Sequence, residues 1–329
     1  MRYRKTLLIA LSALAIPFGL GVSHAQSKGP NGYPDKPLRI VVPFAPGGAT
    51  DIIARVIAQK LTEQIGQQII VENKAGANGN IASAYVAKAP ADGYTLLYNT
   101  SSIAMSPALY KSLSYDVLTD LEPVVLTSVV PLVLAINPSM NANNLQEFIA
   151  LLKANPNKYS YGNAGIGNIT HMASYLLLQT QGLSAASIPY KGSGPSAVAT
   201  VGGEVQFNME PINANLPFIR TQRLRPIAVT TLDRSPVLKD IPTLSESGMP
   251  GFEIGAWQAI MVPAKTAPEV VSFLNREIMK ALADPEVKEK LEVQGAQILG
   301  STPEEYGKYL RSELRRWNEV IKSSGVTLD

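Results

Sequence analysis

The sequence has 329 residues, with 29 Lys and Arg against 26 Asp and Glu, two His and no Cys. The absence of Cys excludes a thiol nucleophile, a Cys-ligated zinc site and an iron–sulfur cluster. The formal net charge is +3, and residues 1–25 carry all of it, so the neutral remainder gives no bulk electrostatic case for binding nucleic acid or an anionic membrane.

Residues 1–25 have the order of a secretory signal peptide. Three basic residues precede an apolar run over 6–22, and small residues form a cleavage site at 23–25. An N-terminal membrane anchor is the alternative, but the run is shorter than the roughly 20 residues that a span needs. We therefore expect an exported, periplasmic chain that is neutral after cleavage and keeps His171 as its one His.

From residue 35 onward, short β-branched runs alternate with stretches of helical periodicity. The expected strands are 38–42, 68–72, 95–98, 124–128, 132–136, 159–162, 185–190, 205–209, 225–229 and 259–262. The expected helices are 52–65, 81–88, 145–154, 170–179, a short one ending at 201, 268–283, 285–294 and 303–323. The last helix has Thr302 as its cap and Pro303 at its first position.

This alternation predicts an α/β fold with mostly parallel sheets flanked by helices. The length favours two lobes over one sheet. We expect residues 35–128 and 255–329 to form lobe 1 and residues 129–254 to form lobe 2. The chain would cross between the lobes near 129–131 and 251–257.

Three loops that open helices are rich in Gly or hydroxyl residues: 43–51, 99–102 and 162–171. Such loops present backbone N–H groups at the positive end of a helix dipole, which suits an anion. Few basic residues lie in them, so we expect a carboxylate held by neutral donors. Gly47-Gly48 is not followed by Gly-Lys-Ser/Thr, which makes a phosphate loop the weaker interpretation.

The candidate ligand-binding residues come from these loops and from two later strand ends. They are Phe44, Pro46, Gly47, Gly48, Ala49, Thr50, Asp51, Thr100, Ser101, Ser102, Asn163, Ala164, Gly165, Gly167, Asn168, His171, Tyr190, Lys191 and Glu210. For some of them a structural role is the alternative: Asp51 as a helix cap, His171 as packing, Lys191 as a solvated side chain. We expect no catalytic residues, no metal site and no cofactor.

Several motifs together resemble the Bug-type receptors, the periplasmic solute-binding proteins of tripartite tricarboxylate transporters. They are Pro43-Phe44-x-Pro46-Gly47-Gly48-x-x-Asp51, Val71-Glu72-Asn73-Lys74-x-Gly76-Ala77, Pro90-Ala91-Asp92-Gly93-Tyr94-Thr95-Leu96, Tyr190-Lys191-Gly192 and Pro242-Thr243-Leu244-x-Glu246. The resemblance covers essentially the whole chain after residue 25.

This resemblance implies a two-lobed periplasmic binding protein fold of type II-like form, with a closing cleft between the lobes. It also implies that loops 43–51 and 162–171 grip a ligand carboxylate, and that a two-component membrane permease receives the ligand. Asn163 stands where the family usually has Ser, and Asn208 and Glu210 flank the point where it commonly has Asp. The first departure removes a hydroxyl contact, and the second leaves recognition of a ligand amine open.

The function expected on these grounds is capture of a small organic carboxylate by a monomeric receptor. A terephthalate-like ligand would suit Phe44 and Trp257 if both faced the cleft. An aliphatic di- or tricarboxylate and an amino acid are the alternatives. A secreted hydrolase is less favoured, because no Gly-x-Ser-x-Gly elbow is present and His171 is the one available base.

Overall fold

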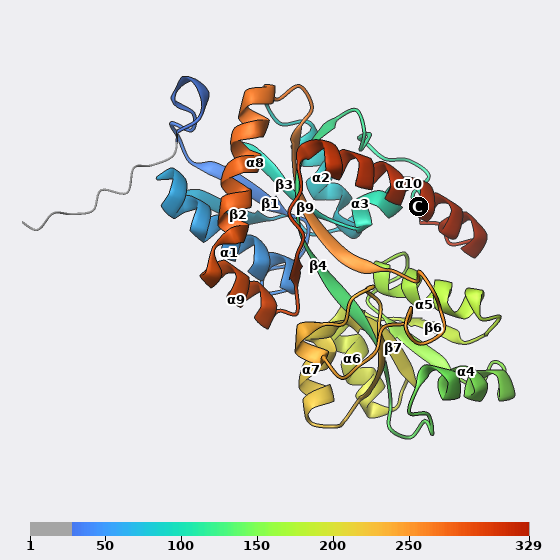
Figure 1. Ribbon diagram of the computed structural model, residues 1–329. Coiled ribbons are helices and arrows are strands. Elements are labelled where there is room, and N and C mark those ends of the chain that lie inside the picture. The colour runs from blue at the N-terminus through green and yellow to red at the C-terminus, as the bar shows by residue number, and fades with distance from the viewer. Residues whose placement is uncertain (1–27, 329) are drawn as a thin grey trace, which may run out of the picture.

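The strands nearest the N-terminus are parallel, and each is followed by a helix (Figure 1). The computed structural model describes residues 28–328, so the expected signal peptide lies outside the described residues. The elements of this part are η1 (Pro30–Gly32), β1 (Leu38–Val42), α1 (Ala49–Ile65), β2 (Ile69–Asn73), η2 (Ala77–Gly79), α2 (Asn80–Ala87), β3 (Thr95–Thr100) and α3 (Ser102–Leu109). The helix expected at 52–65 is confirmed as α1, which ends at Gly66 in the left-handed conformation that Gly adopts without steric cost.

The middle of the chain builds a second half with the same alternation. Its elements are α4 (Leu145–Ala154), β5 (Ser160–Asn163), α5 (Ile169–Thr180), β6 (Ala186–Pro189), α6 (Ser193–Gly202), β7 (Phe207–Pro211), α7 (Ile212–Arg220), β8 (Arg225–Val229) and η3 (Pro236–Leu238). Strand β5 lies between β6 and β7 and pairs with both in parallel. Helices α3 and α7 were not expected, and each contains an internal Pro that obscures its helical pattern.

Two long strands, β4 (Leu121–Ile136) and β9 (Gly255–Pro263), connect the halves. Strand β4 pairs with β9 up to Pro131 and with β7 and β8 from Leu132 and Val133 onward. The strands expected at 124–128 and 132–136 are therefore one continuous strand, visible between the halves in Figure 1. We propose this exchange of partners, beside the expected crossing at 129–131, as one lobe boundary, and the start of β9 as the other.

The expectation of mostly parallel sheets is corrected by these two strands. The sheet order is β2-β1-β3-β9-β4-β7-β5-β6, with β8 and β10 also paired to β4. In the described part of the chain, four strand pairings are parallel and five are antiparallel, and every antiparallel one involves β4 or β9. Strand direction is not encoded in runs of four or five apolar residues, so the sequence pattern did not reveal the mixed sheet. The α/β class and the two-lobed form are confirmed.

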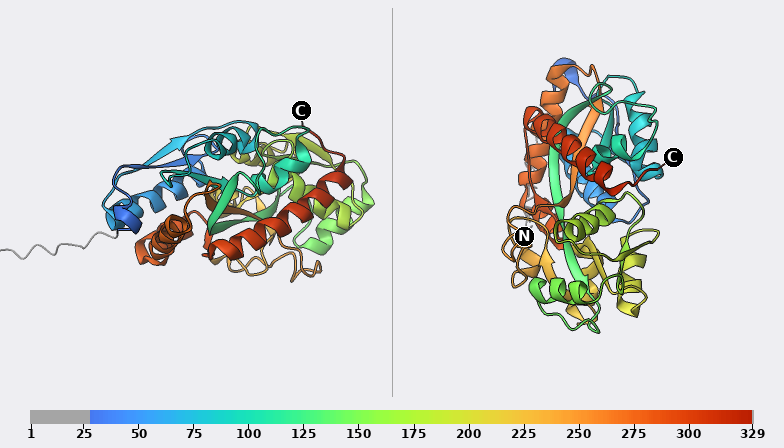
Figure 2. Two further views of the ribbon diagram at one scale, coloured as in Figure 1. Left: turned by 90° about the horizontal axis from the view of Figure 1, so that it is seen from above. Right: turned by 90° about the vertical axis from the view of Figure 1, so that its right-hand side faces the viewer.

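After β9, the chain stays with the first half (Figure 2). The remaining elements are α8 (Pro268–Ala283), α9 (Pro285–Val293), β10 (Gln297–Ile298) and α10 (Pro303–Ser324). Helices α8 and α9 pack against α1, and α10 packs against α3. Thr302 caps α10 in a capping box with Glu305, as the Thr-Pro start predicts.

Large apolar side chains fill both sides of the sheet. One buried cluster packs α1, α8 and α9 against the strands of the first half. Another continues from the first half into the second through β4 and β9. Burial of each Leu, Ile or Phe contributes about 1.5–3 kcal/mol, which lets a chain without disulfides hold its fold. Within residues 28–328, no helix has both the length and the hydrophobicity to cross a membrane.

Candidate ligand-binding cleft

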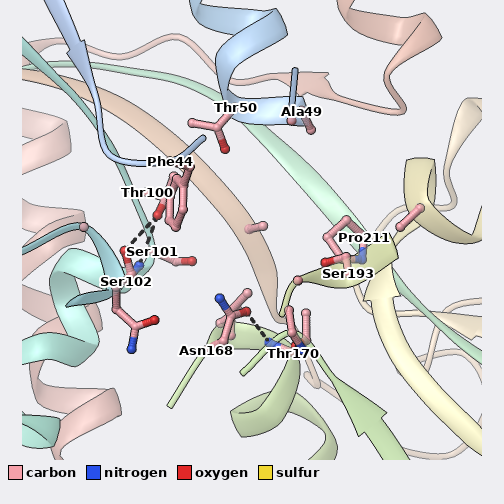
Figure 3. Close-up of a pocket in the computed structure, with 18 of the residues that line it drawn as sticks. Phe44, Ala49, Thr50, Thr100, Ser101, Ser102, Asn168, Thr170, Ser193 and Pro211 are labelled. Atoms are coloured by element: carbon pink, nitrogen blue, oxygen red, sulfur yellow. Dashed lines mark hydrogen bonds between the residues drawn. The ribbon is translucent and has the colours of Figure 1, made fainter. Parts of the chain in front are cut away.

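A cavity of about 630 Å³ lies between the two halves, where loops from both come together (Figure 3). Strands β1, β3 and β7 end beside it, so the loops that follow them form part of its wall. This is the position at which open α/β sheets bind their ligands.

Three helices of the first half begin at this wall. The loop before α1 brings Phe44 and the residues 47–50, and the start of α3 brings Thr100–Ser102. The turn before α2 adds Gly76, Asn78 and Gly79. The Thr100 and Ser102 hydroxyls are 2.9 Å apart and hydrogen-bond each other, which orients both at the cavity edge.

Three helices of the second half begin at the opposite wall. Ala164 and the residues 168–170 come from the start of α5, and Gly192-Ser193-Gly194 come from the start of α6. Pro211, Asn213 and Ala214 come from the start of α7. In Figure 3, Ser193 and Pro211 lie together across the cavity from Phe44 and Thr100.

The starts of these helices have few internal hydrogen-bond partners. No side chain caps α1, α2, α3, α6 or α7 in the structure, while Asn168 caps α5 by accepting the Thr170 N–H at 3.2 Å. The first N–H groups of a helix have no partner within the helix itself. The cavity therefore offers backbone donors from both halves to a ligand.

The lining carries no formal charge. Among the described residues, no Asp, Glu, Lys, Arg or His belongs to the wall, and no group of three or more potential metal ligands occurs. Each helix start carries about half a positive elementary charge from its dipole. These helix dipoles favour a small anion in the cavity without a basic side chain in the wall.

Asp51 lies just behind the wall and orders the first loop. Its buried carboxylate accepts the Gly47 N–H at 2.9 Å, the Asn73 Nδ2–H at 2.8 Å and the Arg55 Nε–H at 2.9 Å. Burial acts to raise the pKa of Asp51, but the hydrogen bonds from Arg55, Gly47 and Asn73 outweigh it and the pKa is lowered. The structure thus places Asp51 as an ionised support for the loop and not on the cavity surface.

The loop 162–171 is ordered in a similar way by residues that were expected to touch ligand. Asn163 donates to Ser187 Oγ at 2.9 Å and accepts the Gly165 N–H at 3.0 Å. His171 Nδ1 accepts the Gly167 N–H at 3.2 Å, and burial lowers its pKa. These side chains shape the turn from behind, whereas Ala164 and Asn168 reach the wall.

The structure brings ten of the nineteen candidate residues to the cavity wall. They are Phe44, Gly47, Gly48, Ala49, Thr50, Thr100, Ser101, Ser102, Ala164 and Asn168. Outside the wall, Pro46 and Lys191 are exposed, Tyr190 donates to Glu204 Oε2 at 3.4 Å, and Glu210 is fully buried behind Pro211. Asp51, Asn163, Gly165, Gly167 and His171 support the loops instead.

The sequence interpretation missed other parts of the wall. Gly192-Ser193-Gly194 opens a helix and has the same small, polar composition as the chosen loops, so that signal was present. Met105, Ala256, Gln258 and the start of α7 carry no such signal. Gln258 is buried on β9 with its Oε1 atom unpaired.

Trp257 does not face the cleft. It is 1 % exposed, and its Nε1–H donates to Glu313 Oε2 at 3.0 Å, on the side of β9 covered by α10. Its neighbours Ala256 and Gln258 line the cavity instead, as the alternation of side chains along a strand requires. Phe44 is therefore the aromatic ring of the wall within residues 28–328.

Residues 53–326 match the tripartite tricarboxylate transporter family receptor. The chain belongs to this family. It is 39 % identical over 298 residues to the protein BugT of Bordetella pertussis, covering 90 % of this chain and 91 % of BugT. The resemblance to Bug-type receptors noted from the motifs is confirmed.

Solved structures of receptors in this group share the fold. The periplasmic binding protein BugD superposes with a TM-score of 0.78 at 35 % identity, covering 90 % of this chain and 99 % of BugD. Rpa4515 of R. palustris, solved with adipate, superposes with a TM-score of 0.81 at 34 % identity, covering 90 % and 99 %. These likenesses extend over both halves and therefore over the whole cleft.

Proposed function

We propose that this protein is a monomeric periplasmic receptor that binds a small dicarboxylate between its lobes and delivers it to a two-component membrane permease. The observation that carries the proposal is the neutral cavity on which six helix starts converge from both halves. Family membership supports the transport role, and the solved complex of Rpa4515 with adipate supports a carboxylate ligand.

The two walls give each carboxylate of the ligand its own set of donors. One carboxylate would accept the N–H groups at the start of α1 and the hydroxyls of Thr100 to Ser102. The other would accept N–H groups at the starts of α5, α6 and α7. Closing the lobes removes water from both sets, which strengthens each hydrogen bond.

An aliphatic dicarboxylate fits this wall better than an aromatic one or an amino acid. Trp257 is turned toward α10, so an aromatic ligand could stack on the ring of Phe44 but on no second ring of the described wall. An amino acid would bring an ammonium group, and the described wall holds no carboxylate to pair with it. The same wall lacks a general base, which argues against a hydrolase.

Calorimetry with adipate, citrate and terephthalate tests the proposal, with adipamide as a control of equal length and no charge. We expect adipate to bind, terephthalate to bind more weakly and adipamide not to bind, because the donors require negative charge. The melting temperature should rise by several degrees with adipate, by less with terephthalate and not at all with adipamide. Absence of binding to all three acids, or equal binding of adipamide, would overturn the proposal.

A further inference from the structure

A carboxyl group is buried directly behind the second-half wall of the cavity. Glu210 on β7 is 0 % exposed, and neither of its oxygens has a hydrogen-bond partner within residues 28–328. Buried polar groups are almost always paired, and an unpaired carboxylate is costly. Such a group therefore calls for an explanation beyond packing.

Glu210 faces the start of α6. Alternation along β7 places Phe207 and Met209 in the core next to α5, and Asn208 and Glu210 on the opposite face. Asn208 donates to Thr200 of α6 at 2.8 Å and accepts from Asn215 of α7 at 2.7 Å, which fixes that face against both helices.

Ser193 lies between the carboxyl group of Glu210 and the cavity. It lines the cavity at the first residue of α6, and its hydroxyl also neighbours Glu210. The hydroxyl of Ser196, one turn later, is buried beside the same carboxyl and has no partner. The next residue of β7, Pro211, lines the cavity as well. A charge on Glu210 would thus lie just behind the donors of α6 and α7.

Among the residues that the structure describes, no formal charge lies beside Glu210 to fix its protonation state. The titratable and charged side chains on the elements packed against β7 are Glu122 of β4, Tyr161 of β5, His171 and Tyr175 of α5, and Arg220 of α7. Tyr161 stacks on Phe207 and His171, on the other face of the strand. Glu122 pairs with Val262 of β9, Arg220 lies at the far end of α7, and α6 has no titratable residue.

Two more titratable side chains lie near the loop that precedes α6. Lys191 is exposed, and Tyr190 hydrogen-bonds Glu204. Burial raises the pKa of Glu210 to about 7, and the neighbouring hydroxyls of Ser193 and Ser196 act in the opposite direction with a smaller effect. The group is therefore free to change its charge near neutral pH.

We propose that Glu210 is a positioning residue that determines specificity: its neutral form lets the α6 and α7 end of the cavity accept a ligand carboxylate, and its ionised form rejects it. This inference rests on the proposed dicarboxylate function. A carboxylate held at the start of α6 disfavours a second negative charge behind it, so Glu210 takes up a proton when the ligand binds. Affinity then falls as the pH rises through the pKa of Glu210.

Calorimetry with adipate at about pH 6.5 and about pH 8.5 tests the inference, because carboxyl groups in water keep their charge in this interval. Burial lowers the pKa of His171, which moves its titration away from the interval. We expect about sixfold weaker binding at the higher pH, which corresponds to a rise in the pKa of Glu210 from about 7 to about 8 on binding. Buffers with different ionisation enthalpies should also show proton uptake by the wild-type protein.

The variants separate Glu210 from other causes. Glu210→Gln keeps the shape but not the charge, so it should bind adipate equally at both pH values. Glu204→Gln, which changes an exposed carboxyl beyond the other end of α6, should behave as wild type. Two results would overturn this inference and leave the proposed ligand standing. One is wild-type binding that neither changes with pH nor takes up a proton. The other is the same pH dependence in Glu210→Gln as in wild type. Absence of adipate binding at every pH in all three proteins would overturn the proposed ligand and this inference with it.

Discussion

The carboxylate of Asp51 accepts a hydrogen bond from the backbone N–H of Gly47 at 2.9 Å, across the first turn of α1. Asp51 also binds Arg55 and Asn73, so one buried side chain joins the loop, the helix and the end of β2. Because this carboxylate is occupied from behind, it does not cap the N–H groups that face the cavity. The loop is thus preorganised for a ligand anion without placing a negative charge on the wall.

Replacing Asp51 with Asn should weaken both the fold and the binding site. An Asn oxygen in the place of Oδ2 can keep the hydrogen bonds from Gly47 and Arg55, but its amide would then face the donor of Asn73, and the negative charge that binds Arg55 is lost. Hydrogen bonds to charged groups contribute about 1.5–3 kcal/mol, and Arg55 is half exposed, so we expect a loss of about 2 kcal/mol. Urea unfolding measures this loss. Asp92→Asn, which breaks an exposed pair with Lys36, should cost less than about 1 kcal/mol, and an equal loss in both variants would contradict the role given to Asp51.

A side chain at Gly48 should leave the fold intact but weaken ligand binding. It has a φ of −76°, and a Cβ atom there would lie 3.8 Å from the nearest atom, Ala45 O. Gly47, with a φ of 84°, would be strained by any side chain and is the poorer test. Because Gly48 lines the cavity at the start of α1, Gly48→Val should block approach of the carboxylate to the N–H groups.

For Gly48→Val we expect an affinity for adipate at least about tenfold weaker, equivalent to about 1.4 kcal/mol, with little change in melting temperature. Calorimetry and thermal unfolding provide the two measurements. Gly202→Val, at the far end of α6 with open space around its Cβ position, is the matched control and should bind as wild type. Unchanged affinity in Gly48→Val would remove the start of α1 from the site.

Local composition predicted the loops before α1, α3 and α5, because a helix start rich in Gly and hydroxyl residues is recognisable from sequence. It did not predict which backbone atoms and which side chains face the cavity. Asn163 and His171 have the chemistry of ligand contacts but hydrogen-bond their own loop instead. That choice depends on turn geometry set by Gly165 and Gly167, both with positive φ.

The larger errors concern relations between distant segments. Two strands were expected at 124–128 and 132–136, yet β4 continues through Pro131 at the point where its partners change. Trp257 was a candidate for the cleft wall. Successive residues of β9 face opposite sides of the sheet, so its neighbours Ala256 and Gln258 lie in the wall instead. The start of α7 reaches the cavity because β7 lies beside β4 in the sheet order, and sheet order is a property of the whole fold.

The buried carboxyl of Glu210 should also make the stability of the ligand-free protein depend on pH. In the unfolded chain it loses its proton near the ordinary pKa of 4.5, and in the folded protein only at about 7. Between these values the unfolded state binds fewer protons, so the free energy of unfolding falls as the pH rises. Below this interval the ionisation of Glu210 does not lower the free energy of unfolding. Above it, the free energy of unfolding is lowered by a constant amount on the order of 3 kcal/mol.

Glu210→Gln removes this cost, because an amide stays neutral at every pH. We therefore expect the variant to gain stability over wild type at about pH 8, by up to about 3 kcal/mol less the penalty of a buried amide, and to lose that advantage at about pH 5. Urea unfolding at both pH values measures the difference. Glu204→Gln should follow the wild-type profile, because its carboxyl is exposed. A constant difference between Glu210→Gln and wild type across this range would mean that Glu210 does not titrate there, and its carboxyl would then act on the cavity in one charge state only.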